Sequence, residues 1–101
     1  MWIIKFTKNA QKDKKAIKSV GLEEKVKKLL NLIANNPFQT PPSYEKLVGD
    51  LAGYYSRRIN IQHRIVYRVL KEERIVVVHS MWSHYGDWTT TSVKKPKKRL
   101  F

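Results

Sequence analysis

The sequence predicts an α+β domain in which a helical hairpin covers one face of an antiparallel-rich sheet of about four strands. Three observations give this class. A short β-type run opens the chain, an apolar stripe at helical spacing lies within residues 22–35, and three β-type runs with hairpin-length connections occupy residues 54–82. The resulting order, β-α-α-β-β-β, gathers the helices on one side of the sheet.

The N-terminal half supplies one strand and both helices. Residues 2–6, WIIKF, have the composition of a strand, and Thr7 offers an N-cap for a helix over residues 8–19. Gly21 interrupts the helical pattern before a second helix begins. That helix carries apolar residues at i, i+4, i+7, i+8 and i+11, namely Leu22, Val26, Leu29, Leu30 and Ile33. The Asn-Asn-Pro sequence at 35–37 ends it.

The C-terminal half supplies the rest of the sheet. Residues 37–53 contain three prolines and two glycines, so we expect an ordered connection with at most one helical turn. Strands are predicted over 54–60, 63–70 and 74–82, and the last is apolar on both sides, as in a central strand. Side chains alternate along each strand, which gives one face suited to helices and one that carries arginines such as Arg58, Arg64 and Arg68.

The composition describes a single small basic domain. The chain has 101 residues, a formal net charge of +13 and no cysteine. Such a charge favours phosphate polymers, anionic membranes or an acidic protein as partners, and the lack of cysteine excludes disulfides and thiolate metal sites. The sequence contains no apolar run long enough to span a membrane, and its N-terminus lacks the features of a signal peptide, so we expect a cytoplasmic protein. We expect the domain to cover residues 1–88 and residues 89–101 to form a basic, flexible tail.

Several side chains near the arginine face suit RNA cleavage without a metal. Glu45 precedes the sheet, and His84 and Tyr85 follow the last predicted strand, where the chain can return over the arginines. A glutamate or histidine can take the proton of a ribose 2′-hydroxyl, and a histidine can protonate the departing 5′-oxygen. Arginine suits the phosphate because its planar fork pairs with two oxygens. The histidines lack the spacing of a metal site, and no cofactor is expected.

The segment YEKLVGDLAGYYSRRINIQHRIVYRV, followed by SHY, resembles the YoeB/Txe branch of the RelE/ParE toxin superfamily. The resemblance runs from about Glu45 to Tyr85 and is carried mainly by the string S-R-R-I-x-x-x-H-R-I-V-Y. It implies a RelE-like fold and a toxin of a bacterial toxin–antitoxin pair that cleaves messenger RNA in the ribosomal A site. It also implies an acidic antitoxin of the YefM/Axe kind as partner.

The same resemblance assigns roles to individual residues. Glu45 takes the position of the general base and His84 that of the general acid. Arg64 takes the position of the arginine that stabilises the phosphate, Arg58 that of a second active-site arginine, and Tyr85 that of a terminal tyrosine that contacts RNA. We also expect Lys46 and Arg57 to contribute to RNA or phosphate binding, although Arg57 is open to a role in salt bridges.

The chain departs from the family pattern at three places. Val48 stands where members of the branch often have a lysine, and Tyr44 replaces the proline before the glutamate. The chain also continues for sixteen residues beyond Tyr85. These departures keep a non-catalytic RNA- or ribosome-binding module open as an alternative function.

The molecular target and the roles of the remaining histidines allow more than one interpretation. Inhibition of gyrase, as in the ParE branch, is a second candidate function, which the combination of glutamate, two arginines and His-Tyr argues against. His63 is expected to orient its loop or to pack beside Tyr67, and His79 to be a structural histidine within its strand. Whether the toxin is a monomer or a homodimer stays open.

Overall fold

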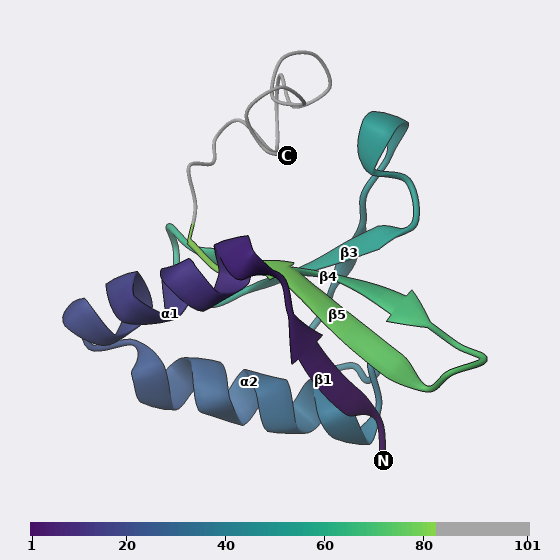
Figure 1. Cartoon of the computed structure of the whole chain (residues 1–101), viewed down its shortest axis with the longest axis horizontal. Coiled ribbons are helices and arrows are strands. Elements are labelled where there is room, and N and C mark those ends of the chain that lie inside the picture. Colours follow the sequence, from purple (N-terminus) through teal and green to yellow (C-terminus); the bar gives the residue numbers. More distant parts are fainter. Residues whose placement is uncertain (83–101) are drawn as a thin grey trace.

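The computed structural model describes residues 1–82 and confirms the α+β class. Its elements are β1 (Ile3–Phe6), α1 (Lys8–Ser19), α2 (Glu23–Asn35), β2 (Glu45–Lys46), the 3₁₀ turn η1 (Gly49–Leu51), β3 (Tyr54–Arg58), β4 (Arg64–Leu70) and β5 (Ile75–Ser80). Within these residues five strands form one sheet in the order β1-β5-β4-β3-β2. β1 is parallel to β5, and the other neighbours are antiparallel. Both helices lie on one face of the sheet (Figure 1).

The sheet has one strand more than the sequence predicts, because β2 lies inside the proline-rich connection. Glu45 pairs with Ser56 and Lys46 with Tyr55 at the edge of the sheet. A strand of two residues is too short to show alternation, so no pattern marks it in the sequence. Its position matters for function because it brings Glu45 onto the sheet.

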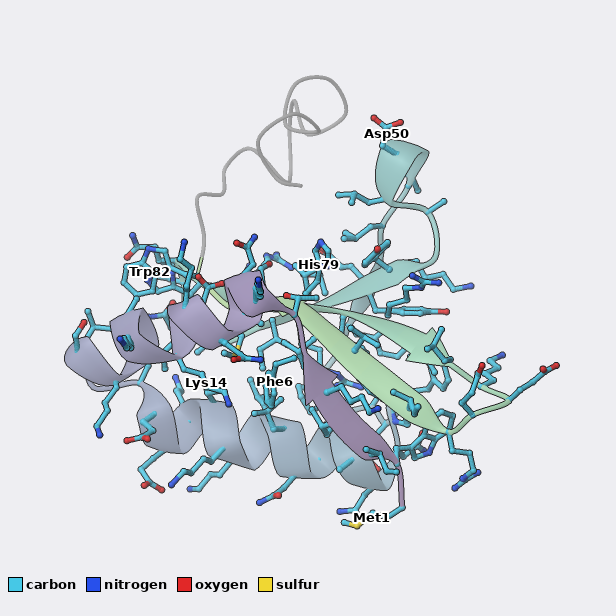
Figure 2. All side chains as sticks on the ribbon, in the orientation of Figure 1. Met1, Phe6, Lys14, Asp50, His79 and Trp82 are labelled. Carbon is cyan, nitrogen blue, oxygen red and sulfur yellow. The ribbon has the colours of Figure 1, made fainter. Side chains whose placement is uncertain are left out.

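The helices begin and end at the predicted signals. The Thr7 side chain accepts a hydrogen bond of 3.1 Å from the Ala10 backbone N–H, which caps α1. Gly21 turns the chain between the helices with φ of 76°, a value that favours glycine. The apolar stripe of α2 faces the core as predicted, with Val26 and Ile33 buried. Lys14 of α1 lies 4.0 Å above the Phe6 ring, where the helix meets β1 (Figure 2).

The core lies between the helices and the inner strands. β5 is central, as predicted, and its Val76 and Val78 are fully buried. Ile65 and Tyr67 of β4 pack with them and with the helical residues Ile17 and Ile33. The opposite face of the sheet carries no α-helix in the described part of the chain, and we call it the open face (Figure 1).

The open face bears the arginines and a small apolar cluster. Register pairs Arg58 with Arg64 and Tyr54 with Arg68 on this face. Leu51 and Val66 are buried together there, against Leu47 and Tyr54. The turn η1, which carries Asp50 at its tip, projects from the sheet on the side away from α2 (Figure 2). Neither helix of residues 1–82 is long and apolar enough to cross a membrane.

Candidate active site

Glu45 and Arg64 are in direct contact on the open face. Arg64 Nη1 donates a hydrogen bond of 3.1 Å to Glu45 Oε1 and one of 2.9 Å to Ser56 Oγ. The strand register explains this contact. Glu45 of β2 pairs with Ser56 of β3, and Ser56 pairs with Val66 of β4. Arg64 lies two residues before Val66 and therefore on the same face of the sheet. The Glu45 side chain is 62% exposed and the Arg64 side chain 18%, so a solvent-accessible carboxylate lies beside a more firmly held guanidinium.

A cleft of about 540 Å³ opens around this pair. Arg58, which faces Arg64 in the register of β3 and β4, lines it together with Glu45 and Arg64. The remaining lining residues come from the loop before β2, from β3, from the β3–β4 turn and from α2; they are Pro42, Ser43, Tyr44, Ser56, Ile59, Asn60, Ile61 and Lys25. The cleft is therefore bordered by one carboxylate and several cations, and its volume is large enough to admit a nucleotide.

Lys25 is the lining residue that the sequence analysis misses. It lies in the first turns of α2, among several lysines that all look like an ordinary solvated helix face. Nothing in its local sequence separates it from Lys27 or Lys28. Only the folded arrangement of α2 and the sheet brings it to the cleft with Arg58 and Arg64, so that three cationic side chains border the space around one carboxylate.

Arg57 is not available for RNA, and the expectation that it binds phosphate is wrong. The side chain is only 1% exposed and lies on the helix-covered side of the sheet, opposite to Arg58. Its guanidinium donates to the Tyr67 hydroxyl and to the carbonyl oxygens of Pro37, Gln39 and Pro42 at 2.7–3.0 Å. Adjacent strand residues point to opposite faces, which separates the two neighbouring arginines.

Lys46 also points away from the Glu45–Arg64 pair. It pairs with Tyr55, whereas Glu45 pairs with Ser56, so the two neighbours face opposite sides of β2. Lys46 is exposed but does not line the cleft. Arg68 lies on the open face farther along β4, where its guanidinium sits 5.9 Å from the centre of the Tyr54 ring. Among the arginines of residues 1–82, Arg58 and Arg64 are therefore the two that border the cleft.

The strand that leads to His84 is fixed beside Arg64. His63, the residue before Arg64, stacks on Trp82 with 4.1 Å between ring centroids. The backbone N–H groups of Met81 and Trp82 donate to the Asp13 carboxylate of α1 at 2.9 and 3.3 Å. His84 and Tyr85 themselves lie outside the described residues, as does the predicted tail over 89–101. Trp82, two residues before His84, is the last described residue.

His63 and His79 have structural surroundings. The His63 carbonyl accepts hydrogen bonds from the Ile59 and Asn60 backbone N–H groups, so His63 organises the β3–β4 turn, as one of the two expectations has it. It packs on Trp82 rather than beside Tyr67. His79 lies 5.2 Å from the Tyr54 ring, and burial, followed by the charge of Arg68, lowers its pKa below the ordinary value of 6.5. No cluster of three or more metal-ligating side chains occurs among residues 1–82.

Comparisons with known proteins find similar sequences and similar folds among bacterial toxins. Residues 5–85 match the family model described as the YoeB-like toxin of bacterial type II toxin–antitoxin systems. The toxin YoeB of Synechocystis is 37% identical over 67 residues, which cover 66% of this chain and 71% of that protein. A YoeB/ParE toxin from Agrobacterium tumefaciens superposes with a TM-score of 0.75 at 32% identity, covering 82% of this chain and 99% of the other.

A third similar protein has been solved in two states. YoeB from Staphylococcus aureus, in a heterotetrameric YoeB–YefM complex, gives a TM-score of 0.72 at 34% identity, covering 84% of this chain and 99% of the other. The same toxin solved as a dimer gives 0.71 at 34% identity, covering 83% and 98%.

Proposed function

The chain belongs to the YoeB-like toxin family of bacterial type II toxin–antitoxin systems, and from this premise we propose that it is a ribosome-dependent endoribonuclease that cleaves messenger RNA in the ribosomal A site. The observation that carries the proposal is the contact between Glu45 and Arg64 at the cleft that Arg58 also lines. This arrangement combines a carboxylate that can accept a proton with two cations that can hold a phosphate.

The proposed reaction is an internal transesterification of the RNA. Glu45 takes the proton of a ribose 2′-hydroxyl, and the oxygen attacks the adjacent phosphorus. The bond from phosphorus to the 5′-oxygen then breaks, and His84 gives that oxygen a proton. The products are a 2′,3′-cyclic phosphate and a free 5′-hydroxyl. His84 and Tyr85 enter this proposal by their position in the family motif.

The cations act on the charge that gathers at phosphorus. Negative charge on the non-bridging oxygens rises in the transition state, and guanidinium groups already in place stabilise it without further reorganisation. Arg64 is suited to this because Ser56 and Glu45 hold its Nη1 in a fixed direction. The described contacts of Glu45 involve Oε1, which leaves Oε2 for the 2′-hydroxyl. Arg58 and Lys25 border the same cleft and would bind flanking phosphates.

The proposed partners are an acidic antitoxin, messenger RNA and the ribosome. The YoeB of Staphylococcus aureus was solved with YefM and also as a dimer. A net charge of +13 would attract an acidic antitoxin of this kind, and also ribosomal RNA. We also propose that the toxin forms a homodimer in the absence of antitoxin. The toxin domain would cover residues 1–88, followed by a basic tail over residues 89–101. Its location would be the cytoplasm, where ribosomes translate.

Primer extension on a short messenger tests the function. The purified chain is added to the messenger alone and to 70S ribosomes that hold it with an open A site. Cuts that appear only with ribosomes, and disappear in His84→Ala, support the proposal. Ribosome binding without any cut, at any concentration of folded protein, would replace it by a non-catalytic ribosome-binding module. The exposed Val48 in place of a lysine would then be the first cause to examine.

A further inference from the structure

The buried Arg57 side chain ties together a segment that has no helix or strand of its own. Its Nη1 donates to the Pro42 carbonyl at 2.7 Å, and its Nη2 donates to the carbonyls of Pro37 and Gln39 at 2.9 and 2.8 Å. Its Nε donates to the Tyr67 hydroxyl at 3.0 Å, and that hydroxyl donates to the Pro37 carbonyl at 2.9 Å. One guanidinium thus meets three carbonyls of residues 37–42.

The burial of this cation is informative because a charge is costly to remove from water. Within residues 1–82 the contacts of Arg57 are carbonyls, a phenol and an aromatic ring, and no carboxylate pairs with it. A charge placed there only to fill the core would be easily replaced by an apolar side chain. The three hydrogen bonds to carbonyls instead specify one path for residues 37–42, whose last residue lies three positions before Glu45.

Tyr44 continues the same arrangement up to Glu45. Its ring lies 5.1 Å from the Arg57 guanidinium and packs edge-on against Tyr55 at 5.7 Å and obliquely against Phe38 at 6.0 Å. The Tyr44 ring is therefore held beside Arg57 and Tyr55, on the helix-covered side of the sheet, while the residue also borders the cleft. Because side chains alternate along an extended chain, Glu45 must then point to the open face, where it meets Arg64.

The pairing of β2 alone does little to fix the direction of the Glu45 side chain. β2 has two residues at the edge of the sheet, and the segment after it turns away through η1. A short edge strand pairs weakly on its own. The direction of Glu45 thus depends on the anchor on its N-terminal side, which consists of Arg57, Tyr44 and the ring cluster of Phe38 and Tyr55.

We propose that Arg57 and Tyr44 are positioning residues that hold the Glu45 carboxylate beside Arg64. The proposal rests on the proposed function, in which Glu45 is the general base. It gives a role to Tyr44, which replaces the proline of the family motif. It also gives a role to Arg57, the buried neighbour of Arg58. Arg57 is buried and does not line the cleft, and the Tyr44 ring packs on Phe38, Tyr55 and Arg57.

The kinetic test uses Tyr44→Ala, because this residue is half-buried and its loss leaves the Arg57 hydrogen bonds in place. Single-turnover cleavage on 70S ribosomes is measured for Tyr44→Ala, Glu45→Gln and the double variant. We expect Tyr44→Ala to slow cleavage about 10- to 100-fold with little change in the concentration for half-saturation. In the Glu45→Gln background the same change should have no further effect, and Tyr44→Phe should restore the rate. An equal loss with and without Glu45 would overturn the proposal.

Trp2→Ala is the matched control. Trp2 also packs against the core and also has an arginine above its ring, Arg74 at 4.9 Å, but it lies beside β1 at the opposite edge of the sheet. Its truncation removes a comparable aromatic side chain without touching residues 37–46. We expect cleavage by folded Trp2→Ala to stay within a few-fold of the unmodified chain. A loss as large as that of Tyr44→Ala would show a general effect of destabilisation and would overturn the positioning role.

A structural readout separates this proposal from the function on which it rests. Crystal structures of the unmodified chain, Tyr44→Ala and Arg57→Lys give the Glu45–Arg64 separation directly, whether or not the chain cleaves RNA. Lysine keeps the charge but concentrates its donors on one nitrogen, so it cannot reach three carbonyls in the guanidinium's directions. We expect the 3.1 Å contact in the unmodified chain and its loss in Tyr44→Ala. An unchanged contact in Tyr44→Ala would overturn the proposal even if the ribonuclease function holds.

Discussion

His63 stacks on Trp82 with 4.1 Å between ring centroids and 23° between ring planes. His63 precedes Arg64 at the start of β4, and Trp82 follows β5, two residues before His84. The stack therefore joins the start of β4, next to the arginine proposed to bind phosphate, to the segment that leads to the proposed acid. Asp13 reinforces this junction from α1 by accepting hydrogen bonds from the Met81 and Trp82 backbone.

The stack predicts an energetic coupling between His63 and Trp82. In a double-mutant cycle with His63→Ala and Trp82→Ala, we expect an interaction free energy of about 0.5–1.5 kcal/mol, as for other aromatic pairs. Urea unfolding followed by circular dichroism measures it. A cycle of His63→Ala with Ile33→Val, which lies in α2, should be additive. Additivity in both cycles would show that the stack contributes no specific stability.

Arg64 and Arg68 form a matched pair on one strand and one face. Of the two, Arg64 touches Glu45 and lines the cleft, whereas Arg68 lies by Tyr54. We expect Arg64→Ala to lower the cleavage rate on ribosomes about 10²- to 10³-fold, the usual effect of removing one donor that stabilises a transition-state anion. Arg68→Ala should change the rate only a few-fold. Similar losses in single-turnover assays of both variants would contradict a specific role for Arg64.

Lys25 and Lys28 allow the same comparison on α2. Lys25 lines the cleft, and Lys28, three residues later on the exposed side of the same helix, does not. We expect Lys25→Ala to weaken binding of a short single-stranded RNA and to reduce the slope of log affinity against log salt by about 0.7, the share of one phosphate contact. Fluorescence anisotropy over a salt series measures this slope. Equal slopes for the two variants would remove Lys25 from the RNA path.

His79 predicts a pH dependence of stability. Burial and then Arg68 lower its pKa in the folded chain, so between that pKa and the ordinary 6.5 the unfolded chain binds more protons. The stabilisation from neutral His79 is thus complete above pH 6.5 and is lost as the pH falls through the folded-state pKa. The free energy of unfolding should fall by at most about 1.4 kcal/mol per pH unit from this group. Urea unfolding from pH 7.5 to 5 should show a shallower fall for His79→Leu, and an unchanged profile would contradict the assignment.

The elements with strong periodicity could be predicted, and β2 could not. The stripe of α2 and the apolar run of β5 are long enough to fix both type and facing, and the structure confirms them. Glu45 and Lys46 become a strand only because β3 lies beside them. Local sequence carries no trace of such a pairing, since proline-rich connections of this kind more often form loops.

The candidate site shows the same division between local and long-range information. The family motif names Glu45, Arg58 and Arg64, and the structure places these three around one cleft. The difference between Arg57 and Arg58 depends on which face of β3 each occupies and on carbonyls of residues 37–42, far from both in sequence. Lys25 reaches the cleft through helix packing alone, which no local pattern among many lysines reveals.

The central claim is that Glu45 acts as the general base of a ribosome-dependent ribonuclease, and Glu45→Gln tests it most directly. Glutamine keeps the shape and can still accept a hydrogen bond from Arg64, but it cannot take a proton at neutral pH. We expect single-turnover cleavage of messenger in 70S ribosomes to fall at least about 10²-fold, while ribosome binding and the thermal unfolding midpoint stay unchanged. Cleavage by Glu45→Gln at the rate of the unmodified chain would contradict the account.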